Sequence, residues 1–336
     1  MQSIISDYNK FKTRLESIKD FVFKFSNKND SLIKAEENDF IIYAKQVERS
    51  LIFYNAIVIS TYGSFENYID DILRDYIYYF YNNNFDVIRN NKKILKKYKD
   101  GISEFLSAPH RFSDELLEKD VLNRYINFVY ENNNGVYDLS FILRHKNNLN
   151  YNQLLDLFSV LDINLNQELF NDVELENYFL TIYEENDYNI KKARNIDALF
   201  YKLNNLVKIR NDVAHGWNED ERISISEIID IIDFLILFAE SLKKVLLINV
   251  VKHSQFEELE IINVFNNHIV CFNNNKHKIS KGDYIYLKDM NNYICARVMS
   301  IEFEHNKIET ISNLDSKNIG IQIDVPCKKS YKIIVE

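Results

Sequence analysis

The periodicity of the apolar residues changes at Val250, and this change limits the possible folds more than any other feature of the chain. Before Val250, apolar residues recur every three or four positions, which is the spacing of one face of a helix. These helical patterns cover about residues 3–25, 37–81, 166–182, 191–214 and 224–248. After Val250, short β-branched and aromatic runs alternate with Asn, Gly, Asp and Ser, as strands and turns do. We therefore predict a mainly α chain that ends in a strand-rich part.

The two kinds of pattern divide the chain into two predicted domains. Residues 1–249 should form a helical bundle that contains a less regular helical insertion at about 82–165. Residues 250–336 contain six short strand patterns, which are typical of a small β-barrel or sandwich. Only six glycines and two prolines occur in 336 residues, too few for an all-β chain with many tight turns. The predicted fold is a helical bundle with a helical insertion, followed by a small C-terminal β-barrel.

The net charge of −9 belongs entirely to the predicted helical domain, because residues 250–336 carry 11 basic and 11 acidic side chains. Affinity for nucleic-acid backbones comes from clustered Lys and Arg, so a net acidic domain is not a general nucleic-acid binder. If the protein acts on RNA, we expect the contact to be local.

The sequence indicates neither a metal site nor a membrane segment. Cys271, Cys295 and Cys327 are odd in number and fit no zinc spacing, so we expect reduced thiols. No Gly-rich phosphate loop, HExxH or paired CxxC pattern occurs, which argues against a cofactor. The N-terminus lacks a signal-peptide core, and charges interrupt the most apolar stretch, residues 228–251. We expect a cytoplasmic, soluble protein with no cofactor, no metal and no membrane contact.

The segment KIRNDVAHG, residues 208–216, places an arginine on the apolar side of the helix predicted at about 191–214. An apolar stripe at helical spacing leads up to it, formed by Ile196, Leu199, Phe200, Leu203, Leu206 and Val207. Arg210 continues this stripe, and a buried guanidinium is costly unless it has a partner. We expect Arg210 to pair with a carboxylate, to reach a helix end, or to face an opening shared with another chain.

His215 follows Arg210 by five residues, about 140° around an ideal helix, and would point away from it. Gly216 fits the left-handed position that commonly ends a helix, and such an ending can swing the His215 side chain toward Arg210. Asn211 lies four residues before His215. Its amide can therefore reach the imidazole and fix which ring nitrogen carries the proton.

These residues carry a resemblance to a known family. The string RNDVAHG is similar to the arginine, polar residue and histidine signature of HEPN-domain ribonucleases, most like those of bacterial toxin and antiphage systems of the MAE_28990 and RiboL-PSP kinds. The likeness extends to the preceding leucine-rich helix, to the long apolar helix that follows, and to the early segment STYGSFENYIDDIL. It implies a HEPN-like helical bundle and a metal-independent endoribonuclease. The active site of such an enzyme forms where two protomers meet, so a homodimer is implied as well.

The resemblance also assigns roles to residues of the motif. Arg210 and His215 take the family's catalytic positions, and Asn211 takes the polar position beside the arginine. We assign supporting roles to Asn211 and to its neighbour Asp212. Cutting RNA through the ribose 2′-OH needs a group that exchanges protons near neutral pH and a cation for the phosphorane charge, and histidine and arginine are such a pair. The alternative is structural, with Arg210 in a salt bridge and His215 as an ordinary C-terminal cap.

Glu66 is a further supporting candidate, in a seam beside the apolar stripe of the early segment. Gly63 precedes it by three residues, and close approach by a neighbouring helix would explain a glycine inside a helix. Glu66 can then pair with Arg210; an exposed glutamate is the alternative. The other histidines have no fixed spacing to a partner, and we expect His110 and His145 to be surface residues.

The strand-rich part has a resemblance of its own. The runs ISKGDYIYL, ARVMSIEF and NIGIQIDV are similar in order and spacing to the second-domain barrel of translation elongation GTPases, over about residues 260–335. This resemblance implies a six-stranded barrel that faces RNA or the ribosome as an adaptor. The alternative is a barrel that only packs or senses.

The function expected from the sequence is that of an endoribonuclease, a toxin or antiphage defence effector that cuts tRNA or another structured RNA. Its expected partners are the RNA substrate, a second copy of the chain, and an antitoxin or another component of a defence system. A non-catalytic, dimeric HEPN-like interaction or sensor protein, whose barrel binds a partner, is the alternative from a different class. An antitoxin-like subunit is a third.

Overall fold

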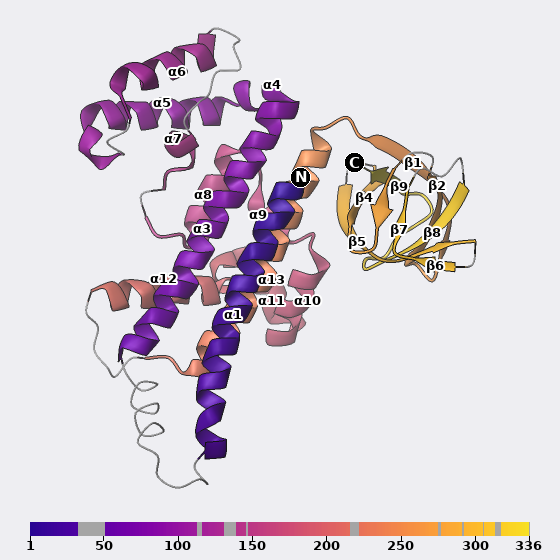
Figure 1. Ribbon diagram of the computed structural model, residues 1–336, viewed down its shortest axis with the longest axis horizontal. Coiled ribbons are helices and arrows are strands. Elements are labelled where there is room, and N and C mark those ends of the chain that lie inside the picture. The colour runs from indigo at the N-terminus through magenta and orange to yellow at the C-terminus, as the bar shows by residue number, and fades with distance from the viewer. Residues whose placement is uncertain are drawn as a thin grey trace. The chain divides into compact units, whose positions relative to one another are not determined.

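The computed structural model describes most of the chain: residues 1–32, 51–112, 116–130, 139–145, 147–215, 222–274, 277–290, 292–304, 306–312 and 317–335. It consists of two compact units, Met1–Lys243 and Lys244–Glu336, and each is described by itself (Figure 1). Helix α13 (Ile225–Lys252) begins in the first unit and ends in the second. The first unit is helical, and the second is built of strands after α13. The expected fold class, a helical bundle followed by a small β-barrel, is confirmed.

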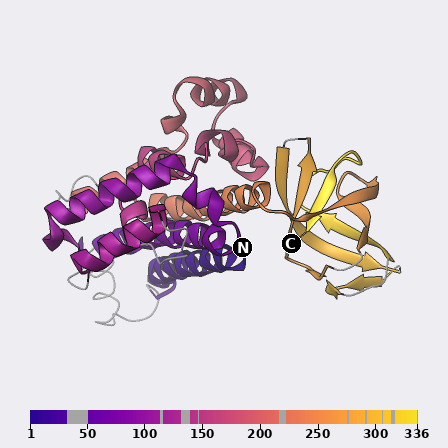
Figure 2. The ribbon, with the colours of Figure 1, turned by 90° about the horizontal axis from the view of Figure 1, so that it is seen from above.

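The centre of the helical unit is formed by α1 (Gln2–Leu32), α3 (Leu51–Asn83) and the first part of α13. Helices α1 and α3 lie side by side in both views (Figures 1 and 2). The apolar side of α1 is buried at helical spacing and includes Ile4, Tyr8, Phe11, Leu15 and Val22. Phe11 stacks on Tyr68 of α3 with 4.5 Å between ring centroids. The Tyr68 hydroxyl donates to the Ala239 carbonyl of α13 at 2.7 Å, so this one residue joins all three helices.

The apolar stripe expected in the early helix is buried in α3. Its members are Val58, Tyr62, Phe65, Ile69 and Ile72. The explanation offered for Gly63 is wrong, because a Cβ atom at this position would meet no described atom within 4 Å. A close approach occurs instead at Gly101, where a Cβ atom would lie 2.8 Å from the Cβ atom of Phe141. The glycine that packing requires is therefore in the insertion.

The insertion predicted at about 82–165 is a set of short helices. They are α4 (Phe85–Arg89), α5 (Lys92–Ser107), the 3-10 turn η1 (Pro109–Arg111), α6 (Glu118–Tyr130), α7 (Leu139–Leu143) and α8 (Tyr151–Val160). Helix α5 begins after Asn91, whose side chain accepts hydrogen bonds from the backbone N–H groups of Lys93 and Ile94. Tyr98 of α5 contacts the rings of Phe128 in α6 and Phe141 in α7. Aromatic contacts therefore hold the three helices together.

The pattern predicted as one helix at 166–182 is two helices, α9 (Leu165–Leu169) and α10 (Val173–Ile182). The break follows from a local cap, because the Asp172 carboxylate accepts a hydrogen bond from the backbone N–H of Glu174 at 3.0 Å. A residue that caps a helix has non-helical backbone angles, so the periodic pattern cannot continue through it.

The pattern predicted as one helix at 191–214 is also divided, into α11 (Glu185–Arg194), the 3-10 turn η2 (Ile196–Ala198) and α12 (Tyr201–Ala214). The residue just before α12 is Phe200, which is fully buried. Its ring stacks on Tyr151 with 3.7 Å between centroids and contacts Phe238 of α13 at 5.3 Å. The start of α12 is therefore fixed by aromatic packing against α8 and α13.

Six strands close the barrel of the second unit. They are β1 (Glu257–Phe265), β2 (Ile269–Asn274), β4 (Tyr284–Asp289), β5 (Asn292–Phe303), β8 (Lys317–Ile323) and β9 (Lys332–Val335). Antiparallel pairs follow the order β1–β2–β8–β5–β4–β9, and β9 pairs with β1 to close the ring. The end of β5 also pairs with β6 (Asn306–Ile308), and β3 (Ile279–Ser280) pairs with β7 (Thr310–Ile311). The six-stranded barrel expected from the sequence is confirmed.

Alternate residues of the barrel strands are buried and form a separate apolar core. On β2 and β8 these residues are Val270, Phe272, Ile319, Ile321 and Ile323. The turn before β4 contains Gly282 with φ of 92°, a left-handed conformation that favours glycine. Among the described residues of this unit, no disulfide joins Cys271, Cys295 or Cys327, and burial raises the pKa of Cys327 to about 11. Within the described residues, no helix combines the length and apolar character that a membrane-spanning segment needs.

Candidate functional site

The residues of the motif lie at the end of α12, a helix that is packed into the core along one side. The buried residues of α12 are Leu203, Leu206, Val207 and Ile209. Arg210, Asn211 and Asp212 are half-buried, and His215 is exposed. The helix therefore presents its motif at the boundary between the core and the surface.

The motif histidine caps the end of α12. The backbone N–H of His215 donates to the carbonyls of Asn211 and Asp212, both at 3.1 Å. Within the described part of the chain, no hydrogen bond joins the His215 side chain to Arg210. Gly216, which the sequence predicted to end the helix in a left-handed conformation, lies outside the described residues. The exposed histidine is thus not hydrogen-bonded to the arginine within the described part of a single chain.

Arg210 lies over the ring of Tyr62, a buried residue of α3. Its guanidinium carbon is 5.3 Å from the ring centroid, which is within the range of a cation–π contact. The guanidinium nitrogen Nη1 also donates to Oδ1 of Asn211 at 3.4 Å, a long and weak hydrogen bond. The ring of Tyr62 is therefore the partner of the Arg210 guanidinium, in place of the expected carboxylate.

Glu66 contacts the same tyrosine as Arg210. The Tyr62 hydroxyl donates to Oε1 of Glu66 at 3.2 Å and accepts a hydrogen bond from the backbone N–H of Leu149 at 2.9 Å. Burial raises the pKa of Tyr62 to about 12, so the hydroxyl keeps its proton at neutral pH. In the described part of the chain, no ion pair joins Glu66 to Arg210; Glu66 contacts the hydroxyl of Tyr62, and Arg210 lies over its ring.

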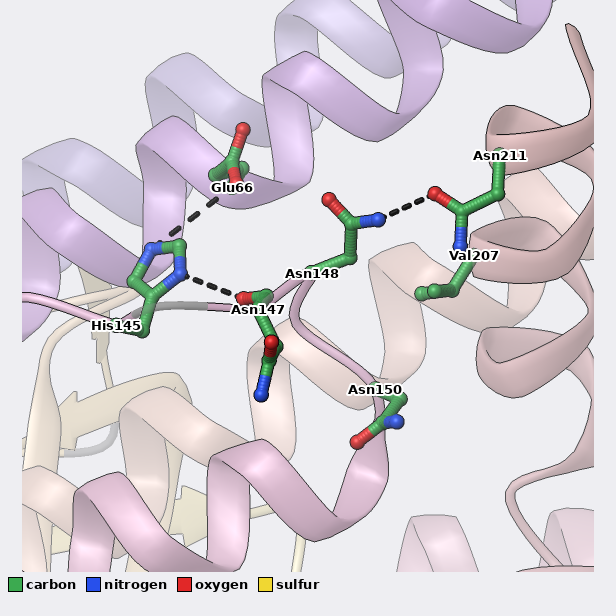
Figure 3. A pocket seen from close by; sticks show the side chains of 7 residues that line it. All are labelled: Glu66, His145, Asn147, Asn148, Asn150, Val207 and Asn211. Carbon is green, nitrogen blue, oxygen red and sulfur yellow. Dashed lines mark hydrogen bonds and ion pairs between the residues drawn. The ribbon is translucent and has the colours of Figure 1, made fainter. Parts of the chain in front are cut away.

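A loop of the insertion brings a histidine next to Glu66. This loop, called the α7–α8 loop, comprises residues 144–150, of which all but 146 are described. Nδ1 of His145 lies 2.9 Å from the carbonyl oxygen of Asn147, and Nε2 lies 4.0 Å from Oε1 of Glu66 (Figure 3). Nε2 also lies 3.7 Å from Oδ1 of Asp70. Only 15% of the His145 side chain is exposed. The prediction that His145 is a surface residue is therefore wrong.

The surroundings of His145 favour its protonated form. If Nδ1 carries a proton, it donates to the Asn147 carbonyl, and Nε2 then faces two carboxylates. Nε2 can donate to a carboxylate only when it is protonated as well. The Asp70 carboxylate raises the pKa of His145 above its usual value, against the lowering effect of burial, and the Asn147 carbonyl and Glu66 act in the same direction as Asp70. These contacts of His145 tie the α7–α8 loop to α3.

Hydrogen bonds fasten the α7–α8 loop on both sides. Toward α3, the backbone N–H of Leu149 donates to the Tyr62 hydroxyl. Toward α12, Nδ2 of Asn148 donates to Oδ1 of Asn211 (Figure 3). Asn211 is thus bonded to the loop and to Arg210, and no hydrogen bond joins its amide to the His215 imidazole in the described part of the chain.

Helices α3 and α12 and the α7–α8 loop border a cavity of about 420 Å³, called the polar cavity. It is lined by Glu66, His145, Asn147, Asn148, Asn150, Val207 and Asn211 (Figure 3). Val207 and Asn211 are four residues apart and share one face of α12, and His215 is the next position on that face. The polar cavity therefore ends about one helical turn from the motif histidine.

The structure brings some of the predicted site residues together. Glu66 and Asn211 line the polar cavity, and Arg210 lies beside it on the ring of Tyr62. Asp212 lies elsewhere, near Tyr54 of α3: burial raises the pKa of Tyr54, and the Asp212 carboxylate adds to this effect. Oδ2 of Asp212 is buried and has no hydrogen-bond partner among the described residues.

Two residues of the site were missed as functional by sequence reasoning. Tyr62 was recognised only as a member of the apolar stripe, and its hydroxyl contacts cannot be read from periodicity. His145 precedes an asparagine-rich run, but no fixed spacing links it to Glu66 or Asp70. Across the described ranges, no group of three or more His, Cys, Asp or Glu side chains is arranged to hold a metal ion.

The helical unit with its arginine and histidine motif defines a HEPN-type domain. A family profile described as RiboL-PSP-HEPN matches residues 9–248, which is more than half of the chain. The chain belongs to the RiboL-PSP-HEPN family, and the resemblance seen in the sequence is confirmed. HEPN domains are commonly ribonucleases, so membership supports a ribonuclease or nucleotide-related role. A comparison with curated proteins found no match.

Proposed function

We propose that this protein is an endoribonuclease in which Arg210 and His215 are the catalytic pair. The observation that carries this proposal is the position of the motif. An arginine seated on the Tyr62 ring and an exposed histidine occupy the end of one helix, beside the polar cavity. Membership of the RiboL-PSP-HEPN family supports the same chemistry.

The reaction is an internal transfer at phosphorus. A base removes the proton from the ribose 2′-OH, and the 2′-oxygen bonds to phosphorus while the bond to the 5′-oxygen of the next nucleotide breaks. The leaving oxygen takes a proton from an acid, so the products are a 2′,3′-cyclic phosphate and a 5′-OH. Histidine can perform either proton transfer near neutral pH. The guanidinium of Arg210 stabilises the negative charge that develops on the phosphorane.

One chain supplies one motif histidine, whereas the reaction needs both a base and an acid. We therefore propose a two-fold dimer in which the ends of the two α12 helices face each other and contribute one His215 each. The exposure of His215, whose side chain forms no hydrogen bond with Arg210 in the described part of the chain, supports this arrangement. A shared cleft would also hydrate the Arg210 guanidinium.

RNA binding by an acidic chain needs a local basic surface. Exposed lysines are clustered on α5 of the insertion and are called the α5 lysine face: Lys92, Lys93, Lys96 and Lys99. We propose that this face contacts the backbone of a structured substrate such as tRNA. The likeness to toxin and antiphage nucleases supports a role as a toxin or defence effector controlled by an antitoxin or another defence component.

The barrel unit is proposed to select the substrate rather than to cut it. All residues assigned to catalysis lie in the first unit, Met1–Lys243. The barrel carries equal numbers of basic and acidic residues from 250 onward, and its resemblance to a translation-factor barrel supports an adaptor that faces RNA or the ribosome.

The test is RNA cleavage by the purified protein in the presence of EDTA. We expect fragments that end in 2′,3′-cyclic phosphate, and a loss of at least about a hundredfold in rate in Arg210→Ala and in His215→Ala. Lys208→Ala and His110→Ala change exposed residues of similar types and should cut like the wild type. Activity that EDTA removes and a divalent cation restores, or that survives both motif substitutions, would contradict the proposal.

A second candidate function is a non-catalytic HEPN-like protein that dimerises and binds a partner through its barrel. The observation that favours it is that Arg210 already has partners inside its own chain, Tyr62 and Asn211, while His215 caps a helix. Such a protein would sediment as a dimer and cut no RNA. The same assay, combined with sedimentation, therefore separates the two functions.

A further inference from the structure

We propose that the polar cavity is a subsite for one unpaired guanine base of the RNA, with Glu66 accepting hydrogen bonds from the Watson–Crick edge of the base. This inference deepens the proposed function and rests on it. It is supported by the position of the cavity, its size, the character of its wall, and the unused hydrogen-bonding capacity of Glu66.

The position of the polar cavity suits a base next to the cut phosphate. Its wall includes Val207 and Asn211, and the same face of α12 continues to His215 one turn later. One helical turn rises about 5.4 Å, so a nucleotide whose phosphate lies at His215 can place its base in the cavity. Arg210, the second catalytic candidate, lies beside the cavity on the Tyr62 ring.

The size and the wall of the cavity suit a flat polar group. Its volume of about 420 Å³ is within the range of small-ligand sites. Four of the residues that line it are asparagines, and Val207 is the one aliphatic side chain among the described lining residues. Such a wall offers little to a lipid or an aliphatic ligand. Unpaired bases of RNA, in contrast, are commonly splayed out and recognised through hydrogen bonds to their edges.

Glu66 has acceptor capacity that the chain does not use. Its Oε1 accepts a hydrogen bond from Tyr62, and each carboxylate oxygen can accept two. Its Oε2 forms no hydrogen bond within the described part of the chain, and 31% of the side chain is exposed. A carboxylate held in place on one oxygen, with a second oxygen that forms no hydrogen bond among the described residues, can serve as a two-point acceptor in the wall of the cavity.

Guanine is the RNA base that matches a two-point acceptor. Its N1–H and 2-amino groups are adjacent donors, which a carboxylate can bind with two parallel hydrogen bonds, as it binds arginine. Adenine and cytosine present an amino group beside a ring nitrogen that is itself an acceptor, and uracil presents one N–H between two carbonyls. For these bases, the second carboxylate oxygen would face a lone pair.

The remaining contacts position the wall of the subsite. His145 holds the α7–α8 loop against Glu66 and Asp70, which makes it a positioning residue rather than a catalytic one. Oδ1 of Asn150 accepts a hydrogen bond from the backbone N–H of Gln153 at 2.9 Å. This capping bond leaves the Asn150 amide N–H₂ group as a donor in the wall, suited to the guanine O6 atom.

The RNA side of the proposal can be tested without altering the protein. Short unpaired oligouridylates would carry a single guanosine, inosine or adenosine. Inosine keeps N1–H and O6 but lacks the 2-amino group, so it loses one of the two bonds to Glu66. We expect wild-type protein to cut the guanosine RNA at a fixed distance from the guanosine. The inosine RNA should be cut about tenfold more slowly, and the adenosine RNA more slowly still.

The protein side uses Glu66→Gln, which keeps the size of the side chain and removes the carboxylate. It should cut the guanosine and inosine RNAs at equal rates, with kcat/KM on the guanosine RNA lowered by about ten- to a hundredfold. The adenosine RNA should be cut at least as fast as by the wild type, because the Gln amide offers an acceptor and a donor that match the amino group and N1 of adenine. The matched control is Asp71→Asn, an exposed acid of the same helix that pairs with Arg74 at 2.7 Å. It should keep the preference for guanosine.

Binding to His215→Ala protein separates this proposal from the proposed function. A tighter Kd for the guanosine RNA than for the inosine RNA, lost when Glu66→Gln is added, supports the subsite even if the wild-type protein cuts no RNA. Equal binding and equal cutting of the two RNAs by proteins that carry Glu66 would overturn the subsite and leave the catalytic proposal intact. A preference that persists in Glu66→Gln would overturn it as well.

Discussion

Replacing Tyr62 with phenylalanine removes a single hydroxyl from the point at which the candidate site is joined together. That hydroxyl donates to Glu66 at 3.2 Å and accepts from the backbone N–H of Leu149 at 2.9 Å. The ring, which lies under the guanidinium of Arg210, stays in place. Tyr62→Phe should therefore loosen Glu66 and the α7–α8 loop without moving the arginine.

The size of the effect follows from the burial of Leu149, which is fully buried and cannot turn its N–H to water. A buried donor left without a partner costs about 1–3 kcal/mol. For a unit of this size, each 1 kcal/mol lowers Tm by about 2–4 °C. We expect Tyr62→Phe to lower Tm by about 2–12 °C in thermal unfolding.

Tyr178→Phe is the matched control, because the Tyr178 hydroxyl is buried and has no hydrogen-bond partner among the described residues. Its loss should change Tm by no more than about 2 °C. In the cleavage assay, Tyr62→Phe should still cut RNA but should discriminate less between guanosine and inosine. Tyr62→Leu also removes the ring under Arg210, so it should lower the rate on every RNA.

Equal values of Tm for Tyr62→Phe and the wild type would refute the reasoning, because the N–H of Leu149 would then be satisfied in another way. A Tyr62→Phe protein that is destabilised but keeps the full preference for guanosine would refute the link between this hydroxyl and the position of Glu66. Either result can be read without knowledge of the natural substrate.

Three further measurements concern other parts of the molecule. The pKa of the His145 imidazole, measured by NMR, should lie above the usual histidine value, and Asp70→Asn should lower it. Because the pKa is raised in the folded state, the ion pair stabilises the fold fully below about pH 6.5. This stabilisation is lost as the pH rises through the folded-state pKa. Alanine substitutions in the α5 lysine face should weaken RNA binding and reduce the slope of log K against log salt by about 0.9 for each duplex phosphate that the protein no longer neutralises. Deletion of residues 253–336, after the end of α13, should leave cutting by the helical unit but alter the cleavage map of total RNA; identical maps would contradict the adaptor role of the barrel.

The periodicity of the apolar residues was sufficient to predict the long helices and the barrel strands. Helices α1, α3 and α13 repeat their apolar spacing over many turns, and the barrel strands alternate over a length that a helix would not allow, so the signal accumulates along the chain. The same spacing predicted continuous helices through Asp172 and Phe200, where the structure has breaks. A capping side chain ends one pattern, and an aromatic stack with Tyr151 sets the start of the next helix. Neither contact changes the apolar period.

The motif also belongs to the part that the sequence determined. Arg210 and His215 are close in the chain, so one helix and its end are enough to place them. Their surroundings were not determined in this way. The sequence offered Glu66 as the partner of Arg210, whereas the structure seats the arginine on the ring of Tyr62 and bonds Glu66 to the hydroxyl of the same residue.

The polar cavity exists only in the tertiary structure. Its wall combines residues from α3, the α7–α8 loop and α12, which are far apart in the chain and share no sequence spacing. The raised pKa of His145 depends in the same way on Asp70, a carboxylate of another element. A protonation state reflects the groups that surround it in space, and the sequence around His145 does not contain them.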